Sequence, residues 1–469
     1  MTELEKLHAA DLDSISNQLK EFYAQKKKVR IYHGSTNSTR PQKYKKGEIV
    51  DISQLKRIIS IDREKKYALV EPNVPMDALV EKTLKFGLVP PVVMELPGIT
   101  VGGGIQGGAG ESSSFKYGLF HDTCLEYEIV LGNGDVIQTS REKNSDLFWG
   151  TACSYGSLGV ITLVKINLIC SKKFVHLAYH RVGSFSEAIS TIKKNAAKSV
   201  DYIDGIMFSK NLGVIMIGNL EDTSKNLPVS TFLNAADEWF YLHAEDKIKK
   251  FTKYEEVIPI KDYLFRYDRG GFWTGWYGFN IFKMPFNRFT RFIFNPLFKA
   301  RNLYRYIHTT NSSQEVFMQD ISFPRETVTQ FIEFVSYFLH IHPLWLCPLK
   351  PGENDKLSPA FSSADLVIDV GIWGPIDKSK DFIEINREIE KITKKFGGRK
   401  VLYAHQYYTP EEFWKIYDLK WYNGLRKKYH AENVFHDVYE KTRVSGTYKR
   451  SIPKGLLSVI KSPFKLPVS

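Results

Sequence analysis

A glycine-dense segment at 97–118, PGITVGGGIQGGAGESSSFKYG, most constrains the folds open to this protein. Glycine is poor material for the interior of a helix or strand, because it loses much backbone entropy and has no side chain to pack. It does let backbone N–H groups approach a ligand closely, and such groups around one concavity suit a diphosphate. Apolar residues interrupt the glycines, which disfavours a flexible linker. The segment therefore predicts a phosphate-binding loop, to which the hydroxyls of Ser112, Ser113 and Ser114 would add donors.

The same segment contains Gly102-x-Gly104-x-x-Gly107, which matches the fingerprint of dinucleotide-binding Rossmann folds. That fingerprint belongs between a hydrophobic strand and an amphipathic helix. Here a Pro97-Gly98 turn precedes it, and more glycine and then serine follow it where a helix should begin. We therefore interpret the match as coincidental.

A second loop rich in small polar groups, HGSTNSTR at 33–40, directly follows a strand-like run at 26–32. Runs of Ser, Thr and Asn are most often simple turns. Paired with the glycine segment, however, this loop predicts the second face of a diphosphate cradle, closed by Arg40.

The composition is that of a soluble globular protein, and 469 residues favour two domains. Four scattered cysteines without metal-ligand spacing indicate a reducing compartment and neither a disulfide framework nor a metal site. The net charge of +13 favours anionic partners: nucleic acid, a membrane surface or a phosphate-bearing cofactor. No nucleic-acid-binding motif is present, so we expect no nucleic-acid partner. The sequence shows no signal peptide and no run long and apolar enough to span a membrane.

Periodicity predicts a strand-rich α+β domain over about the first 170 residues and a mixed α/β domain after it. The elements expected in the first are helices at 3–26 and 75–87, a hairpin of 125–131 with 136–139, a short helix capped by Asn144, and a strand at 160–169. Those expected in the second are helices at 185–198, 231–249, 325–341 and 381–396, and strands at 213–218, 343–348, 364–371 and 401–407.

An aromatic segment at 270–299 holds eleven aromatic and four basic residues and no acidic one. Two interpretations stay open: an element lying on an anionic bilayer, or an aromatic core wall that lines a substrate tunnel. The basic tail at 441–469 is either membrane-seeking or disordered.

Several motifs resemble one family. They are the run 100–118, with ESSSFKYGLF at 111–120; NSDLF at 144–148 followed by Gly156-x-x-Gly159; PLWLCP at 343–348; DLVIDVG at 365–371; LYA at 402–404; and EEFW at 411–414. The protein thereby resembles FAD-binding flavoproteins of the PCMH, or vanillyl-alcohol-oxidase, type, and within them the delta-24-sterol reductase branch. It departs from that branch in showing no spanning segment at its start and in its basic tail.

The resemblance implies an α+β fold of two domains, with an FAD-binding domain at 1–171, a substrate cap domain at 172–400, a segment at 401–440 that returns to the FAD domain, and the tail at 441–469. FAD would be held without a covalent bond, since Gly34 follows His33 where covalently linked relatives usually have serine. The residues that would hold FAD are His33, Gly34, Ser35, Thr36, Asn37, Ser38, Ile99, Thr100, Val101, Gly102, Gly103, Gly104, Gly107, Gly108, Ser112, Ser113, Ser114, Tyr117, Gly118, Gly156, Gly159 and Ile161.

The resemblance also implies an activity: reduction of a C=C bond in the aliphatic tail of a sterol or related isoprenoid lipid, with NADPH as electron donor. Such an alkene is not polarised, so the protein must supply a proton as well as a hydride. Candidates for the acid are Glu111 and the pair Tyr403 and His405, which a strand at 401–407 would place on one face. Asp369, within an apolar strand, would have a raised pKa.

Two other functions stay open: an oxidase of the same fold acting on a sugar, alditol or lactone, and a non-catalytic flavin-binding protein at a membrane. The expected location is peripheral, on the cytoplasmic face of an intracellular membrane, the endoplasmic reticulum if the source is eukaryotic. Membrane contact would run through 270–299 and the tail.

Overall fold

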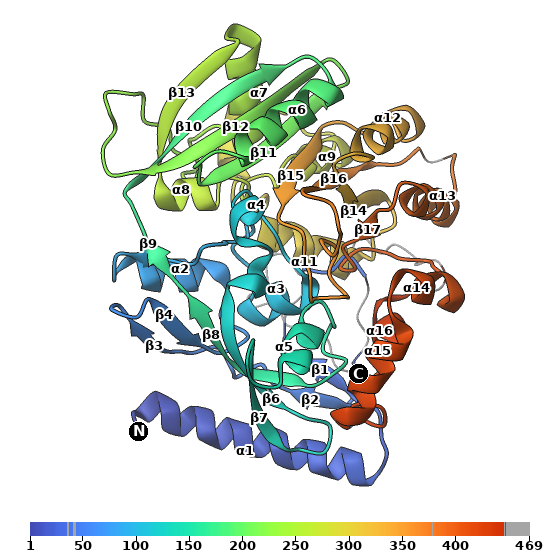
Figure 1. The fold of residues 1–469 in the computed structure, drawn as a ribbon. Helices are drawn as coiled ribbons and strands as arrows, with labels where there is room; N and C mark the ends of the chain where they lie inside the picture. The colour runs from blue at the N-terminus through green and yellow to red at the C-terminus, as the bar shows by residue number, and fades with distance from the viewer. Residues whose placement is uncertain (35–36, 41–43, 378, 445, 447–469) are drawn as a thin grey trace.

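The computed structural model describes residues 1–34, 37–40, 44–377, 379–444 and 446. Two antiparallel sheets dominate it: a five-stranded sheet in the order β3-β4-β8-β6-β7 and an eight-stranded sheet in the order β13-β10-β12-β11-β15-β16-β14-β17. They lie in the lower and upper parts of Figure 1, with the glycine-rich segment between them. The expected α+β architecture, an FAD-binding part with a second sheet domain, is confirmed; the exact domain boundaries stay predictions.

The five-stranded sheet is built largely as the sequence predicts, including the hairpin of β6 and β7. The long helix α1 crosses beneath it (Figure 1), and His8 of that helix bonds to Glu71 and Glu128. The elements are α1 (Glu3–Ala24), β3 (Ile58–Asp62), β4 (Tyr67–Val70), α2 (Met76–Leu84), β6 (Cys124–Val130), β7 (Val136–Ser140), α5 (Ser145–Thr151) and β8 (Val160–Asn167). Smaller pairs are β1 (Arg30–Tyr32) with β2 (Ile49–Asp51), and β5 (Leu88–Val89) with β9 (Ile169–Cys170).

The eight-stranded sheet is covered on both faces, so its central strands β15 and β16 are buried along nearly their whole length rather than alternating between buried and exposed residues. One face packs on α6 (Phe185–Ala196), α12 (Val328–Phe338) and α13 (Phe382–Lys395) around a separate apolar core. The other face joins a core that continues into the five-stranded sheet. The strands are β10 (Phe174–Val182), β11 (Tyr202–Ser209), β12 (Leu212–Glu221), β13 (Lys253–Pro259), β14 (Val316–Pro324), β15 (Leu344–Leu349), β16 (Val367–Pro375) and β17 (Arg399–Lys400).

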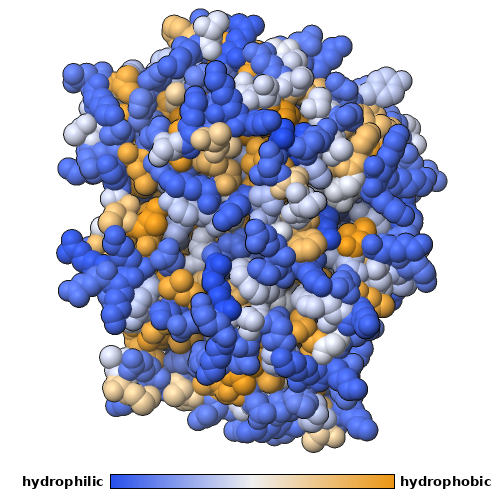
Figure 2. Space-filling view, in the orientation of Figure 1, coloured by the Kyte–Doolittle hydropathy of each residue, from blue (hydrophilic) through white to orange (hydrophobic). Residues whose placement is uncertain are grey.

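Short helices fill the space around the two sheets. They are α3 (Val101–Gly107), α4 (Ser114–Tyr117), η1 (Phe120–Thr123), α7 (Phe240–Lys250), α8 (Ile260–Leu264), α9 (Thr274–Ile281), α10 (Arg288–Ile293), α11 (Ala300–Thr310), α14 (Pro410–Ile416), α15 (Leu419–Lys428) and α16 (Val438–Thr442). The last of these return to the five-stranded sheet: Tyr422 and Arg426 of α15 donate hydrogen bonds to the Ser157 hydroxyl and carbonyl. In Figure 2, hydrophilic side chains predominate on the face shown.

Four local predictions are wrong. The glycine segment contains a helix, α3; the residues at 401–407 form turns instead of a strand; the helix expected at 231–249 begins only at Phe240; and Asn144 adopts a left-handed conformation without a side-chain cap bond. In the second case the segment, which leads from β17 to α14, is hydrogen-bonded to the polar loop that follows β1. The carbonyl of Tyr403 accepts hydrogen bonds from Ser38 and Thr39 of that loop, so it is not available to a sheet.

A buried ion pair joins Asp204 of β11, in the eight-stranded sheet, to Arg266. Arg266 donates to Asp204 at 3.0 Å, and the same carboxylate accepts from Tyr267 and from the indole of Trp345. Both members of the pair are about 1% exposed. Removing one member of such a pair leaves the other charge buried without compensation.

We expect Arg266→Met to lower the free energy of unfolding by about 3–5 kcal/mol, because the Asp204 carboxylate would stay buried. Chemical denaturation of the flavin-loaded protein measures this. The matched control is Asp246→Asn, which removes an exposed pair with Lys250 and should change stability by less than about 0.5 kcal/mol. Equal effects of the two variants would contradict the importance of the buried pair.

Candidate active site

A cavity of about 350 Å³ lies between the first polar loop, the glycine segment and the inner face of the eight-stranded sheet. It brings together segments that are hundreds of residues apart: the first loop, the glycine segment, the turn at 156–161, helix α11 and strands β14, β15 and β16. This is the place expected for a cofactor held by the loops and a substrate held by the cap.

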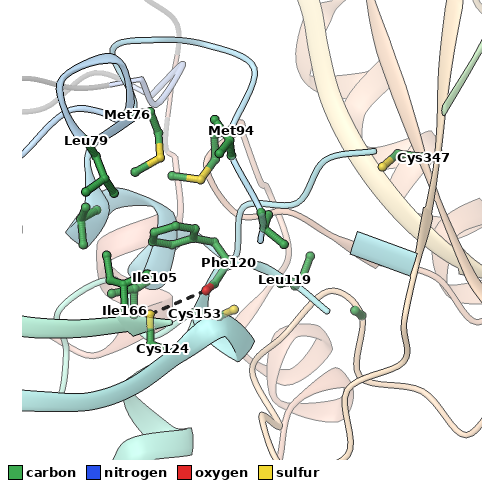
Figure 3. Close-up of a cluster of buried hydrophobic side chains, with 14 of the residues drawn as sticks. Met76, Leu79, Met94, Ile105, Leu119, Phe120, Cys124, Cys153, Ile166 and Cys347 are labelled. Carbon is green, nitrogen blue, oxygen red and sulfur yellow. Dashed lines mark hydrogen bonds between the residues drawn. The ribbon is translucent and has the colours of Figure 1, made fainter. Parts of the chain in front are cut away.

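Helix α3 forms one wall of the cavity, and two of its glycines, Gly102 and Gly104, are closely packed. Thr100 caps it, accepting a hydrogen bond from the Gly103 N–H, and Gly108 ends it in a left-handed conformation (φ 67°). A Cβ on Gly102 would lie 2.8 Å from Pro72, and one on Gly104 would lie 2.5 Å from Met94. Met94 belongs to a cluster with Phe120 and Ile105 beside this helix (Figure 3). The apolar residues of the segment therefore anchor a helix, which glycine count alone disfavours.

The N–H groups at the start of α3 are used inside the protein. Those of Val101, Gly102 and Gly103 donate to Val74, Pro72 and Thr100 respectively. This helix therefore contributes mainly glycine backbone to the cavity, with the Gln106 side chain beside it, and a flat or extended ligand can lie closely along the glycines.

The expected cofactor residues divide into two groups. Those that line the cavity are His33, Asn37, Ser38, Ile99, Thr100, Gly102, Gly103, Gly107, Gly108, Gly156, Gly159 and Ile161. Those that do not are Gly34, Val101, Gly104, Ser112, Ser113, Ser114, Tyr117 and Gly118. Ser35 and Thr36 lie outside the described residues.

The serine run has a different role from the one expected. Ser112 and Ser113 donate backbone and side-chain hydrogen bonds to the two carboxylate oxygens of Glu111, and the Ser114 hydroxyl accepts from the Glu111 N–H. All four residues are buried. Burial raises the pKa of Glu111, while Arg266 and these serines oppose the rise. The serines therefore hold a buried carboxyl group and do not face the cavity.

One end of the cavity is positively charged. Lys441 of α16 donates to the Gly156 carbonyl at 3.1 Å, Arg40 donates to the Lys441 carbonyl at 2.6 Å, and Arg30 also lines this end. Burial, and then the charges of Arg30, Arg426 and Arg40, lower the pKa of Lys441 to about 7. Burial and Lys441 likewise lower the pKa of His33 to about 4. Cations gathered against a glycine turn suit a diphosphate.

The opposite end, formed by the sheet, is apolar apart from a few acidic groups. Its rings and aliphatic side chains are Phe272, Leu303, Ile307, Met318, Trp345 and Trp373. Among them, Tyr403 donates to Asp320 at 2.7 Å and Ser322 donates to Asp369 at 2.7 Å. Desolvation, and then the neighbouring Asp369, raise the pKa of Asp320 well above its usual range. Desolvation raises the pKa of Asp369 to about 7.

The three expected acids differ in position. Tyr403 lines the cavity, whereas His405 and Glu111 do not. Burial, together with Arg40, Lys400 and His308, lowers the pKa of His405 to about 3, so its ring is neutral at physiological pH. Its ring nitrogen lies 3.3 Å from the Thr39 hydroxyl.

Two functional groups were missed from the sequence. Lys441 was assigned to the basic tail, and Asp320 was not singled out at all. Asp320 had the same signal as Asp369, a carboxylate within an apolar strand, VFMQDISFP at 316–324. Only the pairing of β14 with β16 reveals that the two strands present their acids to one cavity.

Comparison with known proteins agrees with this geometry. A family model described as an FAD binding domain matches residues 7–140. Delta(24)-sterol reductase of Homo sapiens is 30% identical over 456 residues, which cover 93% of this chain and 86% of the relative. The chain belongs to the FAD-dependent oxidoreductase family of the delta(24)-sterol reductases. The enzyme of that name from Arabidopsis thaliana is also 30% identical, over 84% of this chain and 76% of its own. L-gulonolactone oxidase of Mus musculus is 24% identical over 91% of this chain and 89% of its own.

The cavity fits FAD by its chemistry. The charged end offers Arg30, Arg40 and Lys441 for a diphosphate, the glycines of α3 allow close approach, and Nδ1 of His33 is a buried polar atom with no hydrogen-bond partner among the described residues. Within the described residues, no helix is long and apolar enough to cross a bilayer.

We expect Lys441→Met to weaken FAD binding about tenfold or more, because a charge-assisted hydrogen bond contributes roughly 1.5–3 kcal/mol. Flavin fluorescence quenching on titration of the apoprotein measures the affinity without reference to activity. Lys194→Met, on the exposed face of α6, is the control and should bind FAD as the wild type does.

The affinity for FAD should also depend on pH. The Lys441 pKa near 7 in the empty protein means that its ammonium is present below pH 7 and is lost as pH rises above 7. An anion binds better to the protonated form, so FAD binding should take up a proton and weaken from pH 7 to pH 9. His33, neutral above about pH 4, should not contribute. A Lys441→Met variant that retains the same pH dependence would contradict this assignment.

Proposed function

We propose that this protein reduces a C=C bond in the aliphatic tail of a sterol or related isoprenoid lipid, with FAD as cofactor and NADPH as the source of electrons. The observation that carries the proposal is the apolar sheet end of the cavity, lined by Phe272, Trp345 and Trp373 and containing Asp320 and Asp369, whose pKa values are raised by desolvation. Relatives named as delta(24)-sterol reductases, matched over most of their length, support it.

The residues at the two ends of the cavity would have different roles. Arg30, Arg40 and Lys441 would hold the diphosphate, and the surface of α3 would accept the extended part of FAD. When bound and reduced, FAD supplies the hydride. The rings of the sheet end exclude water and hold an apolar tail, since burial of apolar surface contributes about 25 cal/mol per Å². The proton comes from an acid in the lining, of which Tyr403 is the one already expected from the sequence.

The alternative is an oxidase of a sugar, alditol or lactone, with oxygen as acceptor. The likeness to L-gulonolactone oxidase supports it. Against it stands the lining: a polyol requires several hydrogen-bonding groups, and the sheet end offers mainly rings and aliphatic side chains.

An anaerobic absorbance titration separates these functions. We expect NADPH to bleach the flavin band, and a delta-24 sterol added in detergent to restore it without oxygen. Bleaching by L-gulonolactone or an alditol, with recovery only in air, would establish the oxidase instead. A protein that takes up no FAD would contradict both.

We further propose that the aromatic segment at 270–299 contacts an anionic membrane from its exposed half. Only part of the segment is exposed. Trp273, Phe279 and Phe298 are buried, so this part of the segment is the core wall considered above. Phe289 and Phe292 are 71% and 52% exposed, and Ile293, Leu297 and Phe282 are exposed beside them. Lys283 and Arg288 are exposed among these apolar side chains, which suits a surface of anionic lipid. The tail beyond 446 lies outside the described residues.

Phe289→Ser combined with Phe292→Ser should reduce co-sedimentation with phosphatidylserine-containing vesicles severalfold while FAD loading is retained. The control is Tyr337→Ser, which removes an aromatic ring that is 80% exposed on α12, outside the aromatic segment. Vesicles of phosphatidylcholine alone should bind less of the wild type, because the basic side chains then lack their partners. Equal sedimentation of all variants would contradict the contact.

A further inference from the structure

Two aspartates on neighbouring strands face the apolar end of the cavity. Asp320 lies on β14 opposite Gly371 of β16, and Asp369 lies two residues before Gly371. Because side chains alternate along a strand, Asp320 and Asp369 project from the same face of the sheet as diagonal neighbours. Both line the cavity, as do Cys347 and Trp373, which share that face.

The position of Asp320 is closely specified. Its Oδ2 accepts a hydrogen bond from the Tyr403 hydroxyl at 2.7 Å, and that hydroxyl accepts in turn from the indole N–H of Trp373 at 3.3 Å. A Cβ on Gly371 would lie 2.9 Å from Asp320 Oδ1, so the glycine leaves space for this carboxyl group. Oδ1 itself has no hydrogen-bond partner within the described residues. One carboxyl oxygen of Asp320 is thus hydrogen-bonded to Tyr403, and the other has no partner among the described residues.

Desolvation and Asp369 raise the pKa of Asp320 well above its usual range, although the hydrogen bonds of Tyr403 and Trp373 oppose the rise. The titratable groups around the pair are Tyr403, Tyr304 of α11, Cys347 of β15 and Glu95, none of which is a cation. Two carboxylates in one apolar site repel each other, and burial disfavours the charge on either. A carboxylic acid that remains protonated at neutral pH can serve as a general acid.

We propose that the carboxylic acid of Asp320 is the proton donor to the substrate double bond, that Tyr403 and Trp373 orient it, and that Asp369 keeps it protonated. This inference rests on the proposed reductase function. It adds a catalytic acid, Asp320, and assigns Tyr403 and Asp369 as positioning residues.

The O–H bond of Asp320 breaks and a C–H bond forms at the less substituted alkene carbon, which leaves cationic character on the other carbon. Hydride from the reduced cofactor forms the second C–H bond, so the alkene gains two electrons and the cofactor loses two. Asp320 is left as a carboxylate beside Asp369, a repulsive arrangement that favours its reprotonation from water before the next turnover.

The decisive variant is Asp320→Asn, which preserves shape and removes the proton. We expect it to bind FAD and to be bleached by NADPH as the wild type is, while recovery of the flavin band by a delta-24 sterol slows at least a hundredfold. The control is Glu326→Gln, the same chemical change at an exposed carboxylate just beyond β14, which should leave both half-reactions unchanged. Recovery in Asp320→Asn within threefold of the wild type would overturn the proposal.

The positioning residues give independent readouts. Asp369→Asn removes the neighbouring charge that helps to keep Asp320 protonated, so the alkaline limb of the sterol-dependent rate should move to lower pH. Tyr403→Phe should slow the sterol half-reaction without changing NADPH-dependent bleaching. If the alkaline limb of the sterol-dependent rate does not move in Asp369→Asn, the proposed action of Asp369 on Asp320 is contradicted, even if Asp320→Asn proves too unstable to test. If the wild type itself never reoxidises with sterol, the proposed function fails instead, and the two failures are distinguishable.

Discussion

The close packing of helix α3 is the constraint on which the cavity depends. Pro72 and Met94 leave no room for a Cβ on Gly102 or Gly104, so this helix lies deeper against the five-stranded sheet than one with larger residues could. Its other side presents glycine backbone and Gln106 to the cavity, which the eight-stranded sheet and α11 also line. A side chain at either glycine would displace the wall toward the sheet and narrow the cavity.

The cavity is divided by charge along its length. Basic groups come from the first loop and from α16, whose return to the five-stranded sheet brings Lys441 to Gly156. Acidic groups come from β14 and β16, and desolvation raises their pKa values. The separation is physically consistent with a ligand that is anionic at one end and apolar at the other. It also keeps the acids away from cations that would ionise them.

Much of the fold followed from local pattern. Alternation and turn residues identified the hairpin of β6 and β7, and apolar periodicity located α6, α12 and α13. The errors have physical reasons. Thr100 and the anchoring side chains Val101 and Ile105 made a helix of glycines, and the tertiary hydrogen bonds of Tyr403 replaced a strand by turns. The serine run was misassigned because its spacing suits phosphate, while its hydroxyls are bonded to Glu111.

The sequence by itself determined the family and, through it, the FAD cofactor, because the motifs that carry the resemblance are local runs of sequence. It also determined the two-domain α+β organisation, through periodicity and turn chemistry. Only the tertiary structure decided which groups meet in the cavity. Asp320 and Asp369 are 49 residues apart and become neighbours through strand register, and Lys441 reaches the glycine turn through the return of the last helices. The charge states of these side chains depend on neighbouring groups and on desolvation, and local sequence determines neither.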